Sequence, residues 1–118
     1  MRTHISLVSL LFLALGANAA SAHAFLDHAN PLVGSTVRAA PREVTLSFTQ
    51  NLEAAFSSME VTDAHGARVD QGKAQISANT MRIGLRSLPS GTYRVRWRVL
   101  SVDTHKTEGS FTFQVGGP

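Results

Sequence analysis

Residues 92–100 read TYRVRWRVL, and this stretch decides the fold class. Apolar or aromatic side chains at positions 93, 95, 97 and 99 alternate with arginines at 94, 96 and 98. Successive side chains of an extended strand point to opposite sides, so this period of two predicts a β-strand with one buried face. We expect Tyr93, Val95, Trp97 and Val99 to face a core and the three arginines to face solvent.

The same alternation recurs along the chain and predicts a protein built from short strands. Its buried positions are Val44, Leu46, Phe48, Met59, Val61, Met81, Ile83, Leu85, Phe111, Phe113 and Val115. Turn-forming residues at 63–66 and 88–91 separate the strands, and residues 51–56 could form a single helical turn. About seven short, half-buried strands predict one all-β domain, an antiparallel sandwich of the immunoglobulin-like kind.

Composition excludes several classes of protein. The chain has 118 residues, which suits one domain, and it has no cysteine. Disulfide scaffolds, thiolate zinc sites, iron–sulfur clusters and cysteine catalysis are therefore excluded. Its formal net charge of +3 is modest, and the row of three arginines is typical of a solvated strand face, so nucleic acid is not an expected partner.

The first 22 residues have the organisation of a cleaved signal peptide. Arg2 precedes an uncharged, mostly apolar run from Ile5 to Leu15, and Ala20-Ser21-Ala22 offers a cleavage site. A membrane anchor is the alternative, but this run is well short of the ~20 residues that span a bilayer. We therefore expect an exported domain of residues 23–118 that begins at His23 and has no stable membrane insertion.

Histidines and one carboxylate indicate a metal site. Cleavage would give His23 both a free α-amine and an imidazole, which together can chelate a metal ion. Asp103 and His105 follow the strand at 92–100, and in extended backbone residues i and i+2 project from one face, ~6.5–7 Å apart. Three nitrogens and one oxygen suit tetragonal Cu(II), with tetrahedral zinc as the competing assignment. His65 is expected in a surface turn, and His28 is a spare ligand at most.

Thioether ligands for Cu(I) are scarce. Met59 and Met81 are the only methionines after residue 22, and both lie at apolar positions of the alternating pattern. We expect both to fill the core.

The chain resembles the CopC family of periplasmic copper-resistance proteins. The resemblance covers residues 23–115 and is carried by HAFL at 23–26, NP at 30–31, GS at 34–35, FTQNLEAAFS at 48–57 and LPSGTYRVRWRVLSVDTHKTEGSFTFQV at 88–115. It implies a small Greek-key β-sandwich that binds one Cu(II) through the amine and imidazole of His23 together with Asp103 and His105. It also implies a copper carrier that sequesters the ion or passes it to a CopD-like inner-membrane transporter.

Two departures from the family pattern matter. Some members carry a methionine-rich Cu(I) loop that this sequence lacks, so only the Cu(II) site is carried over. Some members have an acidic residue where this chain has Gln50, whose amide could still accept a hydrogen bond from the His23 ring.

Two other functions remain open from the residues. A terminal histidine with a second histidine on a β-sandwich also resembles the histidine brace of lytic polysaccharide monooxygenases. Against an enzyme, the Asp103 carboxylate would occupy the position that oxygen needs, and the chain's one Trp and one Tyr are both expected to be buried. The second alternative is a sandwich interaction domain without a metal. We expect a copper carrier and no enzyme.

Overall fold

The computed structural model describes residues 26–116, which form eight strands and one short 3-10 helix. The elements are β1 (Leu26–Asn30), β2 (Thr36–Val37), β3 (Glu43–Phe48), η1 (Ala54–Phe56), β4 (Ser58–Thr62), β5 (Asp70–Ser77), β6 (Thr80–Leu85), β7 (Gly91–Leu100) and β8 (Lys106–Val115). The proposed signal peptide and His23 lie outside the described residues. No helix within the described range is long and apolar enough to cross a membrane.

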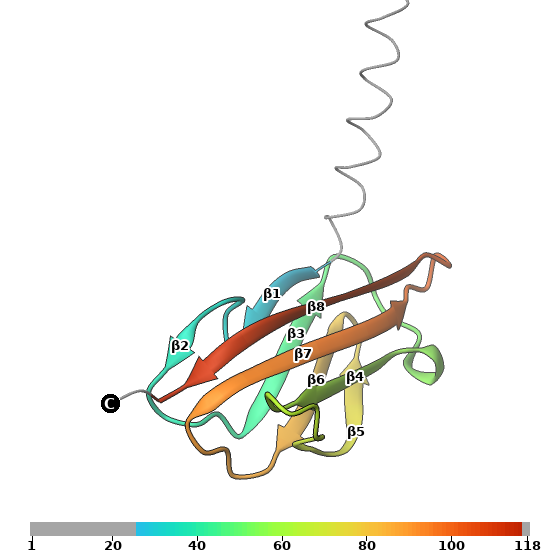
Figure 1. The fold of residues 1–118 in the computed structure, drawn as a ribbon. Helices are drawn as coiled ribbons and strands as arrows, with labels where there is room; N and C mark the ends of the chain where they lie inside the picture. The colour runs from blue at the N-terminus through green and yellow to red at the C-terminus, as the bar shows by residue number, and fades with distance from the viewer. Residues whose placement is uncertain (1–25, 117–118) are drawn as a thin grey trace, which may run out of the picture.

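The strands form two four-stranded sheets packed face to face (Figure 1). One sheet has the order β1-β3-β6-β5 and the other the order β2-β8-β7-β4. All pairs are antiparallel except the short pair β2–β8. The predicted all-β sandwich is confirmed, with eight strands in place of about seven.

The alternating positions form the core as predicted. Tyr93, Val95, Trp97 and Val99 of β7 are buried, and Met59 and Met81 are buried with them. Apolar side chains from both sheets fill the space between the layers, in a single cluster that runs from Val44 to Val115. Burial of this apolar surface is the main source of the fold's stability.

The sequence predicted the helical turn η1 but not the strand β5. The helical turn expected at 51–56 is present as η1. Strand β5 was not predicted, because its sequence, DQGKAQIS, has no clear alternation and most of its side chains are exposed. It is an edge strand whose pairing with β6 is interrupted between Gln71 and Gln75, where Gly72 adopts a φ of 72°. Such a bulge removes the period of two on which the sequence prediction depends.

Trp97 packs closely against a glycine on the neighbouring strand. Gly109 lies opposite Trp97 in the β7–β8 pair, and the ring also contacts Phe48 edge-on, at a centroid distance of 6.2 Å. A Cβ atom added at Gly109 would lie 2.6 Å from Cζ2 of the indole. The ring therefore occupies the space that a side chain at position 109 would need.

We expect Gly109→Ala to destabilise the domain by about 1–3 kcal/mol, because a well-packed core resists an added methyl group. Urea unfolding followed by Trp97 emission measures the effect. Gly84→Ala is the matched control, since the nearest atom to its added Cβ is 4.0 Å away, also within a strand. Equal stability of the two variants would show that the indole moves aside at no cost.

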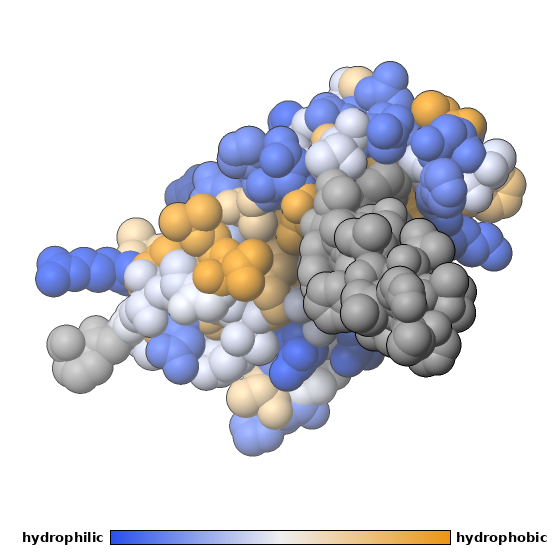
Figure 2. Space-filling view, turned by 90° about the horizontal axis from the view of Figure 1, so that it is seen from above, coloured by the Kyte–Doolittle hydropathy of each residue, from blue (hydrophilic) through white to orange (hydrophobic). Residues whose placement is uncertain are grey.

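The exposed apolar side chains are few. Seen from above, a hydrophobic patch lies beside the grey atoms, and a smaller one lies at the upper right among hydrophilic residues (Figure 2). Among the described residues, the large hydrophobic side chains that remain exposed are Leu32, Val33, Phe56 and Val102.

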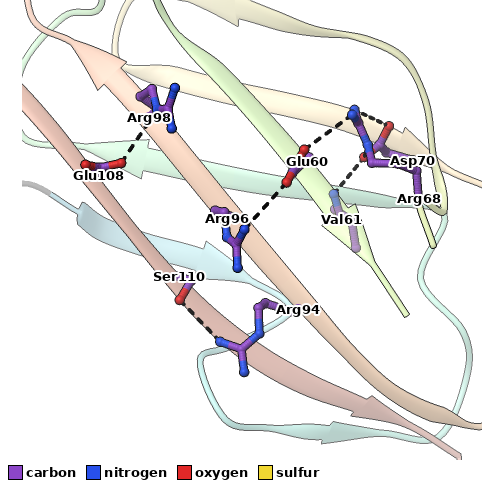
Figure 3. A network of polar contacts seen from close by, with 9 residues as sticks. All are labelled: Glu60, Val61, Arg68, Asp70, Arg94, Arg96, Arg98, Glu108 and Ser110. Atoms are coloured by element: carbon purple, nitrogen blue, oxygen red, sulfur yellow. Dashed lines mark hydrogen bonds and ion pairs between the residues drawn. The ribbon is translucent and has the colours of Figure 1, made fainter. Parts of the chain in front are cut away.

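A buried carboxylate lies beside the free edge of β4. Asp70, at the start of β5, accepts a 2.7 Å hydrogen bond from the backbone N–H of Val61. Its two oxygens also accept bonds of 2.9 Å each from Nε and Nη2 of Arg68 (Figure 3). The Asp70 side chain is only 5% exposed. Its bond with Val61 connects β4, at the edge of one sheet, to β5, at the edge of the other.

Candidate metal site

The β7–β8 turn brings together two of the predicted ligands. Asp103 and His105 lie in the turn at residues 101–105, between the paired residues Leu100 and Lys106. The turn is closed by two backbone bonds, from Ser101 N to His105 O at 3.0 Å and from Thr104 N to Ser101 O at 2.9 Å. Nδ1 of His105 lies 3.3 Å from Oδ1 of Asp103, so the two side chains converge.

The backbone geometry behind this convergence differs from the prediction. We expected an extended segment, and the structure instead has a tight turn in which Thr104 adopts a φ of 73°. This left-handed conformation is unusual for a threonine. It reverses the chain direction between the two ligands, so Asp103 and His105 approach each other through the turn and not along a strand.

Ser101 is the residue that sequence reasoning missed. Ser101 is completely buried. Its hydroxyl donates a hydrogen bond to Oδ1 of Asp103. The Ser101 Oγ atom also accepts a 3.1 Å hydrogen bond from the backbone N–H of His105. Its position offered a signal, because it continues the inward-facing series of odd-numbered residues that ends at Val99. A buried polar side chain needs hydrogen-bond partners, and this one finds them in the two candidate ligands.

The electrostatics of the turn favour an ionised carboxylate. The hydrogen bond from Ser101 lowers the pKa of Asp103, loss of solvent contact opposes this, and the neighbouring His105 lowers the pKa further. Both side chains remain accessible, with Asp103 47% and His105 78% exposed. The turn thus presents an anionic oxygen and an imidazole to solvent.

We expect Ser101→Ala to raise the pKa of Asp103 toward the ordinary aspartate value in the metal-free protein. Because the folded-state pKa is depressed, ionised Asp103 adds stability that is present at neutral pH and lost as pH falls through that pKa. The alanine variant should show less of this acid sensitivity. A carbon-13 pH titration of the Asp103 carboxyl measures the shift, with Ser110→Ala on the exposed face of β8 as control. An unchanged pKa would contradict the role of the Ser101 hydroxyl.

The start of β1 lies at the same end of the sandwich as this turn (Figure 1). Leu26 pairs with Phe48 at the end of β3. Three residues after Phe48, Asn51 accepts a 3.0 Å hydrogen bond from the backbone N–H of Val102 in the β7–β8 turn. Exposed Gln50 belongs to this connecting segment.

The other two histidines among residues 26–116 are surface residues. His28 is 79% exposed, and its Nδ1 lies 3.0 Å from Oδ2 of Asp27. His65 lies in a turn in which Asp63 accepts the backbone N–H groups of His65 and Ala67, as expected for a surface turn. Within residues 26–116 no group of three or more histidine, aspartate or glutamate side chains could hold a metal ion.

A comparison with protein-family models matches residues 26–116 to the CopC domain. The chain belongs to the CopC family. Protein YobA of Escherichia coli K12 is 38% identical over 98 residues, which cover 80% of this chain and 79% of YobA. Copper resistance protein C of Escherichia coli is 35% identical over 106 residues, which cover 81% of this chain and 83% of that protein.

A solved CopC structure supports the fold. CopC from Methylosinus trichosporium OB3b superposes with a TM-score of 0.72 at 34% identity, covering 79% of this chain and 93% of that one.

Proposed function

We propose that the protein binds one Cu(II) ion in the periplasm, through the amine and imidazole of His23 together with Asp103 and His105. The observation that carries the proposal is the convergence of Asp103 and His105 in a CopC-family domain, with Ser101 bonded to both residues. A homologue named copper resistance protein C supports copper as the ion.

His23 is close in sequence to the strand that starts at the same end of the sandwich as the turn. His23 precedes Leu26 by three residues, which span at most about 11 Å when fully extended. Strand β1 starts at Leu26, at the end of the sandwich that holds the β7–β8 turn. Segment 48–52 is connected to this turn, because Leu52 forms an isolated bridge with Ser101. The exposed Gln50 amide in this segment is a candidate hydrogen-bond partner for the His23 ring.

The donor set favours Cu(II) over zinc. An α-amine and two imidazoles supply three nitrogens, and the Asp103 carboxylate supplies one oxygen. Copper stands highest among divalent first-row metals for such ligands, and four donors of this kind suit a tetragonal geometry. With reference pKa values of ~7.7–8 for the amine and ~6.5 for imidazole, copper can displace the protons near neutral pH.

The proposed role is copper sequestration or delivery, with a CopD-like inner-membrane transporter as the receiving partner. The two exposed ligands of the β7–β8 turn favour exchange with a partner over permanent burial of the ion. A carrier, unlike a histidine-brace monooxygenase, is expected to show no oxygen-dependent turnover when its copper is reduced.

A Cu(II) titration of residues 23–118, followed by electron paramagnetic resonance, tests the proposal once intact mass has confirmed His23 as the first residue. We expect saturation at one ion per chain and the axial, nitrogen-rich spectrum of a tetragonal site. Adding one alanine before His23 removes the α-amine from that residue and should change the spectrum. The control is His65→Ala. An unchanged spectrum after the addition would overturn the proposed ligand set.

A further inference from the structure

The outer face of the β2-β8-β7-β4 sheet carries a row of arginines. Arg94, Arg96 and Arg98 project from β7 on the side opposite the core (Figure 3). Alternate residues of a strand are about 6.5–7 Å apart, so the row presents guanidinium groups at regular intervals. This row has no part in the proposed metal site.

Polar side chains flank the row on both neighbouring strands. In the β-sheet register, Arg94, Arg96 and Arg98 lie opposite Thr62, Glu60 and Ser58 of β4 and opposite Thr112, Ser110 and Glu108 of β8. This part of the face therefore presents no large apolar side chain, although an apolar centre is typical of a protein–protein interface.

Three carboxylates offset part of the basic charge, and one of them, Asp70, is paired with Arg68 through both of its oxygens. Glu60 is shared between Arg68 at 3.3 Å and Arg96 at 4.0 Å, and Glu108 lies 3.6 Å from Arg98. Arg94 has a hydroxyl partner, with Nη1 at 3.3 Å from Ser110 Oγ. Arg68, Arg96 and Arg98 are 55%, 62% and 78% exposed. Each guanidinium therefore keeps N–H donors for an external anion.

The chemistry of this surface suits phosphate. Guanidinium groups bind phosphate oxygens in a bidentate manner, and the hydroxyls of Ser58, Ser110 and Thr112 stand beside them as further donors. We propose that this arginine face, defined as Arg94, Arg96 and Arg98, binds the anionic headgroup layer of a phospholipid membrane.

The exposed apolar residues at one end of the arginine face support a membrane over an acidic protein. Phe56, 69% exposed, precedes Ser58 by two residues, and Ser58 pairs with Arg98. Val102, 51% exposed, lies in the turn that follows β7. Basic residues beside exposed aromatic and aliphatic side chains are typical of interfacial membrane binding. In this orientation the β7–β8 turn lies close to the lipid surface.

Vesicle co-sedimentation of metal-free residues 23–118 tests the arginine face. We expect binding to vesicles of phosphatidylglycerol and phosphatidylcholine, and none to phosphatidylcholine alone. Replacing Arg94, Arg96 and Arg98 by glutamine should weaken this binding at least about ten-fold at low salt, since each basic residue near the surface contributes to attraction. Added salt should also weaken vesicle binding by the wild-type protein, because it screens the attraction between charges.

The matched control replaces Arg42, Arg82 and Arg86 by glutamine, which removes the same charge from exposed positions outside the arginine face. This control should keep vesicle binding. Equal loss in both triple variants, or no preference of the wild type for anionic vesicles, would overturn the proposal. Displacement from vesicles by millimolar inorganic phosphate, or tighter binding to poly-glutamate than to vesicles, would overturn it in favour of a free anion or an acidic protein. Because no copper is present, these outcomes are independent of the proposed metal site.

Discussion

Replacing His105 by alanine is expected to weaken Cu(II) binding by about 100-fold or more, since even residues that only orient metal ligands commonly change affinity 10–100-fold. His105 would supply one of three nitrogens to the proposed site. Isothermal titration with a competing chelator measures the change. The spectrum of any residual complex should have one fewer nitrogen ligand.

The fold of the His105→Ala variant should be unaffected. The His105 side chain is 78% exposed, and the bonds that close the turn use its backbone N–H and carbonyl groups, which alanine retains. His28→Ala removes a comparably exposed imidazole from β1 and should leave the affinity unchanged. If the two variants bound Cu(II) equally well, His105 would not be a ligand.

Replacing Asp70 by alanine is expected to lower the free energy of unfolding by about 2–4 kcal/mol. The change leaves the buried Val61 N–H without its acceptor, at a cost of about 1–3 kcal/mol, and removes the partner of half-exposed Arg68, at about 1 kcal/mol. Thermal unfolding should therefore occur about 8–32 °C lower, given about 4–8 °C per kcal/mol for a domain of this size.

Two further variants define the origin of the Asp70 effect. Asp70→Asn keeps an oxygen that can accept the Val61 N–H and should fall between the wild type and Asp70→Ala. Asp27→Ala removes a carboxylate that is 53% exposed and should change stability by less than about 0.5 kcal/mol. An Asp70→Ala protein as stable as the Asp27→Ala protein would show that water replaces the carboxylate.

The sequence predicted those parts of the fold where burial has a regular period. Strands β3, β4, β6, β7 and β8 each have one face in the core, and a strand of that kind must alternate apolar and polar residues. Strand β5 escaped prediction because it lies at an edge and contains a bulge, so burial imposes little pattern on it. A strand shows alternation only where one of its faces contacts the core, and most side chains of β5 are exposed.

The candidate metal site was predictable in composition and less so in geometry. Asp103 and His105 were identified from their residue types and their spacing, and the structure brings them together. The left-handed Thr104 and the buried Ser101 hydroxyl were not foreseen, because turn conformation depends on contacts between both strands of the hairpin. The place of His23 in the site stays a prediction.

The burial of the two methionines has a consequence for a domain that handles copper. Copper promotes oxidation, and methionine sulfoxide formation turns an apolar side chain into a polar one that disrupts a core. Within residues 26–116, Met59 and Met81 hold all the sulfur, and they are 4% and 0% exposed. Because so little of either side chain meets solvent, oxidative damage should depend mainly on how often the sandwich opens.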